Sequence, residues 1–208
     1  MSLILEYRTI SVSNQNEVKE KKSLFISYIF PVTNEEEIEK NLTMLRKKYS
    51  DATHHCYAYK LLNGKTKFAD DGEPHRTAGM RIMNAIEHHQ LTNVLTVVVR
   101  YYGGTKLGVG PLGKAYYDSA LSAIKPSDIV TLTLHKKIII TFDFTYESLI
   151  RRFFFSNKIK IIKENYSTLV ECECLFPFTS EVQIINQLQE LTNGKISIVT
   201  TGEQEYVS

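Results

Sequence analysis

Residues 100–114, RYYGGTKLGVGPLGK, combine positive charges, aromatic rings and glycines directly after the apolar run VLTVVV. Five of the chain's ten glycines fall within residues 103–113. Glycine lets a ligand approach the backbone, and the unpaired N–H groups at the start of a helix favour anions. The pattern therefore indicates an anion site at the end of a strand. The alternative is that the glycines serve only tight packing between a strand and a helix.

A phosphate backbone is the anion that these residue types suit best. Lysine and arginine supply salt-sensitive affinity for phosphates, and exposed aromatic rings stack on bases. The candidate contacts are Arg76, Arg100, Tyr101, Tyr102, Gly104, Lys106, Gly108, Gly110 and Lys114.

Two familiar phosphate motifs do not fit this run. No Gly-Lys-Ser/Thr follows the spaced glycines, as a P-loop requires. The segment GVGPLG matches G-x-G-x-x-G, but its acidic partner, expected about 20 residues later, would fall near residue 128, between the predicted domains. We expect neither a dinucleotide nor any other cofactor.

The segment FADDGEPHRTAG, residues 68–79, is rich in acids and turn-forming residues. Asp70, Asp71 and Glu73 are suited to three roles: holding a divalent cation, accepting hydrogen bonds from backbone amides that fix the loop, or pairing with a nearby cation such as Arg100 or Lys106. Metal is the weakest of these because no further ligands follow at a recognisable spacing, and we expect none. Thr77 is expected to cap the next helix.

The segment THHCYAY, residues 53–59, alternates along a strand, so His54 and Cys56 share one face while His55 and Tyr57 share the other. A Cys/His nucleophilic site needs the imidazole within hydrogen-bond reach of the thiol. Side chains two residues apart on a strand project side by side, so we favour a half-buried strand without catalytic function.

Composition narrows the class of protein. The chain has 208 residues, of which 43% are hydrophobic, and contains no apolar run of eighteen residues. The N-terminus does not resemble a signal peptide, and the three cysteines form no disulfide framework. We expect a cytosolic protein with no membrane contact. A net charge of +2 does not by itself indicate nucleic-acid binding.

The order of elements predicts an α+β protein of two domains, 1–130 and 131–208, with Pro126 interrupting the last helical pattern before the boundary. In the second domain, strands at 136–144, 158–166, 168–176 and 195–200 and helices at 146–157 and 180–194 follow the βαββαβ, ferredoxin-like order. The later helix is expected to bury Val182, Ile185 and Leu188. In the first domain, strands at 6–12, 22–32, 53–62 and 93–102 alternate with helices at 33–50, 77–91 and 110–124.

Several segments together resemble the N-terminal domain of the IMPACT family, whose bacterial members are called YigZ proteins: ATHHCYAY, FADDGEP, TAG, LTNVLTVVVRYYGGTKLGVG and KAYYDSAL. The resemblance implies that the first domain has the fold of domain two of ribosomal protein S-five, with a left-handed crossover, followed by a ferredoxin-like domain. It also implies a link to translation, because the eukaryotic relatives regulate translation. The chain departs from the family pattern at His75-Arg76 and at Pro111, which lacks a backbone donor.

These observations predict a translation-associated regulator that binds RNA or the ribosome through the basic, glycine-rich strand end. The alternative is a regulator that binds a protein partner. A hydrolase that uses Asp70, Asp71 and Glu73 with a metal is less favoured, so we expect a binding protein rather than an enzyme.

Overall fold

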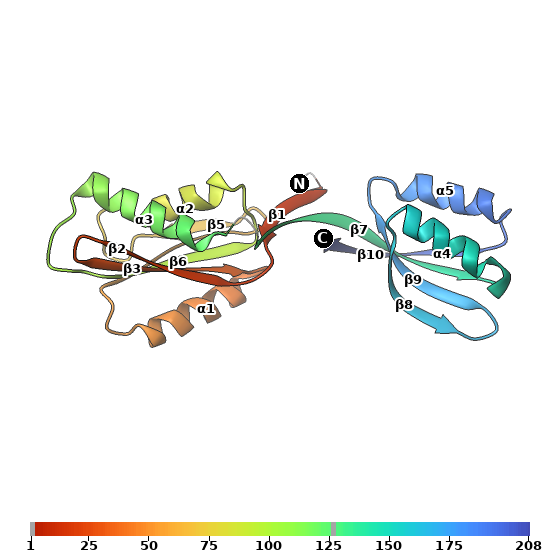
Figure 1. Ribbon diagram of the computed structural model, residues 1–208, viewed down its shortest axis with the longest axis horizontal. Coiled ribbons are helices and arrows are strands. Elements are labelled where there is room, and N and C mark those ends of the chain that lie inside the picture. The colour runs from red at the N-terminus through yellow and green to blue at the C-terminus, as the bar shows by residue number, and fades with distance from the viewer. Residues whose placement is uncertain (1–2, 126–127) are drawn as a thin grey trace. The chain divides into compact units, whose positions relative to one another are not determined.

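The computed structural model describes residues 3–125 and 128–208, so Pro126 lies outside the described residues. These residues form two compact units, one of Tyr7–Thr131 and one that joins the residues up to Glu6 to Leu132–Ser208 (Figure 1). Both units pair helices with antiparallel sheets, which confirms the predicted α+β class.

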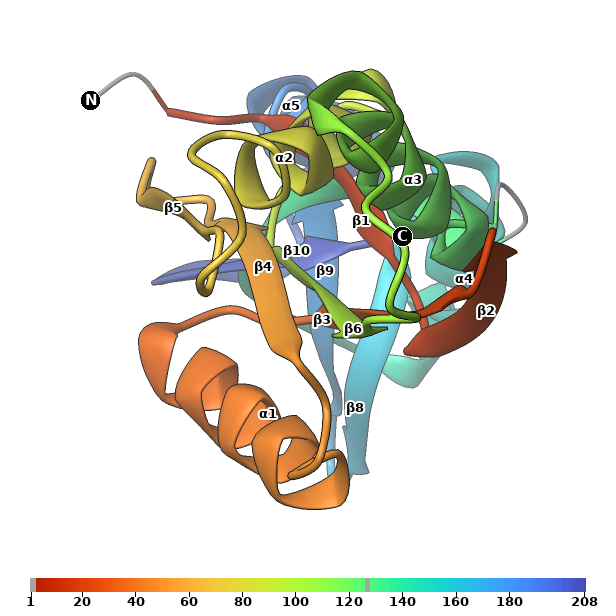
Figure 2. The same cartoon turned by 90° about the vertical axis from the view of Figure 1, so that its left-hand side faces the viewer.

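The first unit is built on one five-stranded sheet in the order β2-β3-β6-β4-β5. Helices α2 and α3 lie on one face of this sheet and α1 lies on the other (Figures 1 and 2). The bounds are β1 (Glu6–Ile10), β2 (Asn14–Glu20), β3 (Ser23–Pro31), α1 (Glu35–Lys48), β4 (His54–Lys60), β5 (Thr66–Ala69), α2 (Gly79–His88), β6 (Val94–Tyr101) and α3 (Val109–Ala123).

The central strand β6 is apolar on both faces because helices cover both. Val94 and Val98 pack in the cluster formed with α2 and α3, while Val97 and Val99 pack in the cluster formed with α1. The neighbouring strand β4 alternates in the same way: Cys56 lies on the α2–α3 side and Tyr57 on the α1 side, so these two residues face opposite ways as predicted. Strands β4 and β6 are therefore held by a hydrophobic cluster on each face of the sheet, and these clusters fix the positions of the strand ends.

The second unit has the predicted βαββαβ order, and its strands pair as β10-β7-β9-β8, all antiparallel. Two helices accompany this sheet. The bounds are β7 (Ile129–Phe142), α4 (Glu147–Ser156), β8 (Lys160–Tyr166), β9 (Val170–Pro177), α5 (Glu181–Leu191) and β10 (Ser197–Val207).

The predicted inner face of α5 is partly wrong. Val182 is 68% exposed, whereas Ile184 is 4% exposed and Leu188 is fully buried. The buried row begins at Glu181, whose carboxylate forms an ion pair with Lys136 of β7. The paired carboxylate of Glu181 occupies the first inward position of the helix. The buried face of α5 therefore differs from the face that the apolar residues alone indicate.

Two short strands were not predicted, β2 and β5. Both lie at the edges of the first sheet, and neither has an apolar alternation that a sequence pattern reveals. None of the helices in residues 3–125 and 128–208 is both long and apolar enough to cross a membrane.

Candidate functional site

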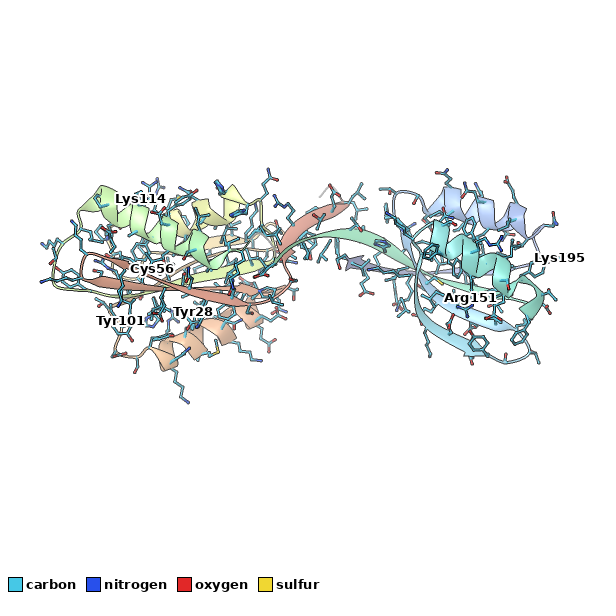
Figure 3. All side chains as sticks on the ribbon, viewed as in Figure 1. Tyr28, Cys56, Tyr101, Lys114, Arg151 and Lys195 are labelled. Carbon is cyan, nitrogen blue, oxygen red and sulfur yellow. The ribbon has the colours of Figure 1, made fainter. Side chains whose placement is uncertain are left out.

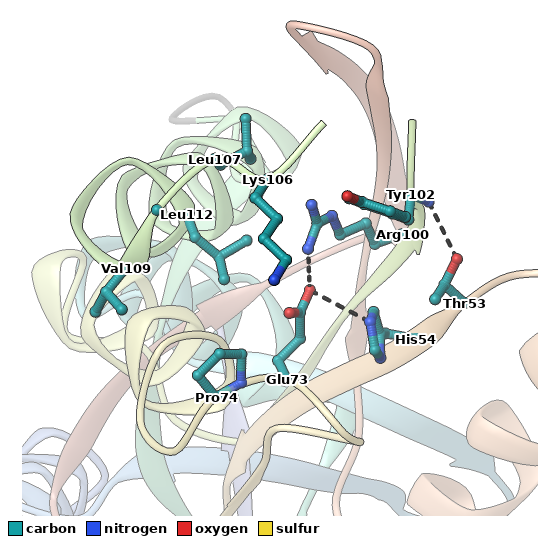
Figure 4. Close-up of a pocket in the computed structure, with 11 residues that line it drawn as sticks. Thr53, His54, Glu73, Pro74, Arg100, Tyr102, Lys106, Leu107, Val109 and Leu112 are labelled. Carbon is teal, nitrogen blue, oxygen red and sulfur yellow. Dashed lines mark hydrogen bonds and ion pairs between the residues drawn. The ribbon is translucent and has the colours of Figure 1, made fainter. Parts of the chain in front are cut away.

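A cleft of about 440 Å³ lies where β4 begins, β6 ends and α3 begins (Figure 4). Five of the predicted site residues line it, namely Glu73, Arg100, Tyr102, Lys106 and Gly108. The other lining residues are Thr53, His54, Pro74, Leu107, Val109 and Leu112. The structure therefore brings part of the DDGEP loop against the glycine-rich run, although 27 residues separate Glu73 from Arg100.

The floor of the cleft is a buried ion pair between Glu73 and Arg100. Arg100 Nη1 donates to Glu73 Oε1 over 2.5 Å, and the two side chains are only 4% and 5% exposed. The Tyr116 hydroxyl donates to the same Oε1 over 2.7 Å. One carboxylate oxygen thus binds both the end of β6 and helix α3. Pairing of an acid with Arg100 is one of the three roles that the sequence left open.

Arg100 is committed to the floor rather than to solvent. Its Nη2 donates to the Ser23 hydroxyl over 3.2 Å, and its guanidinium carbon lies 5.2 and 5.4 Å from the ring centroids of Phe25 and Tyr102. Its Nε is buried and has no hydrogen-bond partner among the described residues. Arg100 therefore supports the Tyr102 ring and positions Glu73, and its charge is already compensated.

His54 stands at the edge of the same floor. Its Nδ1 lies 2.7 Å from the Asp71 carbonyl oxygen, which can only accept, so Nδ1 is the donor. Its Nε2 is directed at Glu73 Oε1 across 3.7 Å, as Figure 4 shows. A loop carbonyl thus fixes the orientation of the ring that faces the cleft.

Lys106 and the start of α3 form the upper side of the cleft. Figure 4 shows the Lys106 amino group pointing into the cleft, and it has no ion-pair partner among the described residues. Gly108 precedes α3 with a φ of 87°, a conformation that favours glycine, and its carbonyl accepts from Leu112 N. The first turn contains no acidic residue and no side-chain cap, so the amides of Val109 and Gly110 have no helical partner.

The other two acids of the DDGEP loop hold the loop in shape. Asp70 accepts from the backbone amides of Arg76, Ala78 and Gly79 at 2.8–3.1 Å. Asp71 accepts from the backbone amide of His55 at 2.6 Å. No group of three or more His, Cys, Asp or Glu side chains in the described ranges is arranged to hold a metal.

The expected cap by Thr77 is wrong. Its hydroxyl donates to the Pro74 carbonyl over 2.6 Å, and the Asp70 carboxylate accepts instead from the amides of Ala78 and Gly79, where α2 begins. A side chain from outside the helix has taken the capping role because the loop folds back over the start of α2.

The remaining candidates lie away from the cleft. The Tyr101 hydroxyl donates to Asp51 over 2.7 Å, and its ring packs with the cluster on the α1 side, whereas Lys114 lies on α3 and pairs with Asp118 (Figure 3). Gly104 and Gly110 do not line the cleft, nor does Arg76. The structure thus separates Tyr101 from Tyr102, which the sequence grouped together.

Tyr116 and Ser23 were not predicted as site residues. Tyr116 is completely buried, and its position on the inner face of α3 indicates packing and gives no signal that its hydroxyl reaches Glu73. Cys56 Sγ lies 3.4 Å from the Tyr116 hydroxyl and 2.9 Å from the Asp70 carbonyl oxygen. Burial raises the pKa of the Cys56 thiol above its ordinary value, so the thiol is not an activated nucleophile.

Comparison with known proteins identifies the family. Residues 21–124 match the Impact N-terminal domain. The IMPACT family member YvyE of Bacillus subtilis is 30% identical over 207 residues, which cover 99% of this chain and 95% of YvyE. The IMPACT family member YigZ of Escherichia coli is 28% identical over 193 residues, covering 88% of this chain and 92% of YigZ.

A solved structure shares the fold over nearly the full length of the chain. It is the crystal structure of a hypothetical protein, with a TM-score of 0.63 and 24% identity, and the match covers 97% of this chain and 100% of that one. The match over residues 21–124 includes every residue of the cleft, and the match to YvyE extends through both units. The chain therefore belongs to the IMPACT family.

Proposed function

We propose that this protein is a translation-associated regulator that binds RNA, free or within the ribosome, through the phosphate backbone at the mouth of the cleft. Membership of the IMPACT family supports a role related to translational regulation. The three cysteines are free and buried, which suits a protein of the reducing cytosol, and we place it there.

The observation that carries this proposal is the position of Lys106. Its amino group has no carboxylate partner in the described residues, and it stands beside the open start of α3, whose first turn has no acid. A cation next to unpaired backbone amides is the combination that attracts a phosphate. Pro111 has no backbone N–H, so the donors available at this end of the helix are the N–H groups of Val109 and Gly110.

Tyr102 adds a surface for a base. Tyr102 is 43% exposed, and the Arg100 guanidinium carbon lies 5.4 Å from the centroid of its ring. A ring held in this way stacks on an unpaired base with little loss of side-chain freedom. RNA presents unpaired bases in loops and at ends, so phosphate and aromatic contacts together favour single-stranded or structured RNA over duplex DNA.

Further exposed lysines lie outside the cleft, on the β2–β3 turn and on α3. The turn between β2 and β3 packs against Gly103, because a Cβ at that glycine would lie 1.9 Å from the Lys22 carbonyl oxygen. Lys21 and Lys22 in this turn are exposed. The Lys114 side chain is 75% exposed and pairs with Asp118, an exposed ion pair of the kind that adds little stability and can exchange for a phosphate.

The decisive experiment is fluorescence anisotropy with labelled structured RNA and with ribosomal particles, at low and near-physiological salt. We expect Lys106→Ala to weaken RNA binding by roughly threefold to tenfold and to reduce the slope of log K against log salt by about 1. Lys195→Ala is the matched control, because Lys195 is also an exposed lysine but lies in the second unit.

Unchanged binding by Lys106→Ala would contradict the proposed contact. No RNA or ribosome binding by the wild-type chain at low salt would reject the proposal as a whole. In that case, a pull-down that survives nuclease treatment would favour a regulator that binds a protein partner.

A further inference from the structure

The floor of the cleft contains a hydrogen-bond acceptor that none of the described residues uses. Glu73 Oε1 accepts hydrogen bonds from Arg100 and from the Tyr116 hydroxyl, whereas Oε2 has no hydrogen-bond partner among the described residues. The Glu73 side chain is 5% exposed and lines the cleft. Oε2 is not among the fully buried side-chain atoms that lack a partner, so it remains open to the cleft and is suited to accept a hydrogen bond from a ligand.

An unpaired donor lies in the same floor. Arg100 Nε is buried without a partner in the part of the chain that the structure describes. The Arg100 side chain is 4% exposed and faces the cleft together with Glu73. Nε lies beneath the surface of the floor, so the group that a polar ligand can reach is the Glu73 carboxylate, which Arg100 and Tyr116 hold in place.

The walls of the cleft are apolar where the floor is polar. Leu107 and Leu112 are buried side chains on one side, Pro74 stands opposite them, and the Tyr102 ring closes one end (Figure 4). The volume of about 440 Å³ lies in the range of small-molecule sites. A flat, mostly apolar group with a polar edge fits walls and a floor of this kind.

We propose that the cleft takes one unstacked nucleotide whose base carries an exocyclic amino group. This inference rests on the proposed function and names the part of the RNA that enters the cleft. The phosphate binds Lys106 and the open amides of α3, the base lies between the apolar walls, and its amino group donates to Glu73 Oε2.

The preference among bases follows from the chemistry of the acceptor. An ionised carboxylate only accepts hydrogen bonds, so it pairs with the amino groups of adenine, cytosine and guanine. Uracil presents one ring N–H between two carbonyl oxygens, and these oxygens repel the carboxylate. The cleft therefore discriminates against uracil even though the phosphate contact is the same for every nucleotide.

The test is isothermal titration of the full chain with AMP, CMP, GMP, UMP and purine riboside 5′-monophosphate. The last compound is AMP without its amino group, so it isolates the contact to Glu73 without changing the protein. We expect AMP to bind with a Kd on the order of 1 mM or tighter and about tenfold more tightly than either purine riboside 5′-monophosphate or UMP.

Protein variants locate the site. Lys106→Ala is expected to weaken all the nucleotides by the same factor, because it removes a phosphate contact, and Lys195→Ala is expected to change none of them. Tyr102→Ala is expected to weaken AMP more than inorganic phosphate, because inorganic phosphate has no base to contact the ring.

Each contrary outcome has a separate meaning. Equal affinity for AMP, purine riboside 5′-monophosphate and UMP would overturn the inference and leave a phosphate contact only. RNA binding without measurable binding of any nucleotide would also overturn it, with the proposed function intact. Selective binding of AMP without RNA binding would support the inference and contradict the proposed function. Absence of both nucleotide binding and RNA binding would reject both the inference and the proposed function.

Discussion

Arg100 and Glu73 form an ion pair that joins the end of β6 to the DDGEP loop, with Arg100 Nη1 2.5 Å from Glu73 Oε1. Both side chains are almost completely buried, and the Tyr116 hydroxyl shares the same carboxylate oxygen. Three segments that are distant in sequence therefore meet at one atom. The cleft depends on this contact for its shape, since it fixes the positions of the floor, the loop and helix α3.

Replacement of Glu73 by alanine is expected to destabilise the protein by about 3–5 kcal/mol, because it leaves the Arg100 charge buried without a partner. Urea unfolding followed by circular dichroism measures the change. Glu35→Ala is the control, since Glu35 pairs with Lys65 over the same 2.5 Å but both side chains are more than half exposed. Equal effects of the two substitutions would show that the buried pair has no special weight.

Two glycines of the same run are expected to respond oppositely to alanine. At Gly103 a Cβ would lie 1.9 Å from the Lys22 carbonyl oxygen, so Gly103→Ala must displace backbone and costs about 1–3 kcal/mol or more. At Gly110 no atom lies within 4 Å of an added Cβ, and Gly110→Ala is expected to stabilise by about 0.4–1 kcal/mol. Thermal unfolding of both variants measures the contrast, and a destabilised Gly110→Ala would contradict it.

Substitutions at the neighbouring residues Tyr101 and Tyr102 are expected to have different effects on RNA affinity. Tyr102 lines the cleft, so Tyr102→Ala is expected to reduce RNA affinity by roughly tenfold, corresponding to the stacking of one base. Tyr101 faces the α1 side, where its hydroxyl binds Asp51, so Tyr101→Phe is expected to leave RNA affinity unchanged. Anisotropy with one labelled RNA compares the two variants, and a larger effect at Tyr101 would relocate the binding surface.

Stability is expected to fall in alkaline solution because of the buried thiols. Burial raises the pKa of the Cys56 thiol and raises that of Cys172 to about 11, whereas thiols in the unfolded chain ionise near pH 8.5. Above that pH the folded protein retains more protons than the unfolded chain, so the free energy of unfolding decreases as pH rises; below it, these thiols contribute no slope.

Urea midpoints measured from pH 7.5 to 10.5 check this dependence. The Cys56→Ala variant is expected to start from a lower stability and to lose less of it across the range. Identical slopes for the variant and the wild-type chain would mean that the Cys56 thiol ionises equally in both states.

The fold was predictable where apolar periodicity alone decides burial. The βαββαβ order of the second unit and the two faces of β4 follow directly from such patterns. The phase of α5 was not predictable in this way. Glu181 is buried through its pairing with Lys136, and a sequence pattern assigns both residues to the surface.

The candidate site was predictable in outline but not in its contacts. The glycine-rich run and the DDGEP loop were each recognisable, and pairing with Arg100 was one of three roles open to the acids. Which acid pairs depends on how loop 70–79 folds over β4, and local sequence does not specify that. Tyr116 carried no signal, because the reach of a buried hydroxyl is a property of the assembled structure.

The Asp70 carboxylate is expected to control the hydrogen exchange of three backbone amides in the loop. The amides of Arg76, Ala78 and Gly79 all donate to its carboxylate, and none of them donates to a strand neighbour or to a preceding helical turn. Their protons are shielded only while that one side chain keeps its rotamer. These three amides should therefore show a common protection factor against exchange with solvent deuterium, which makes the release of the Asp70 carboxylate measurable without any ligand.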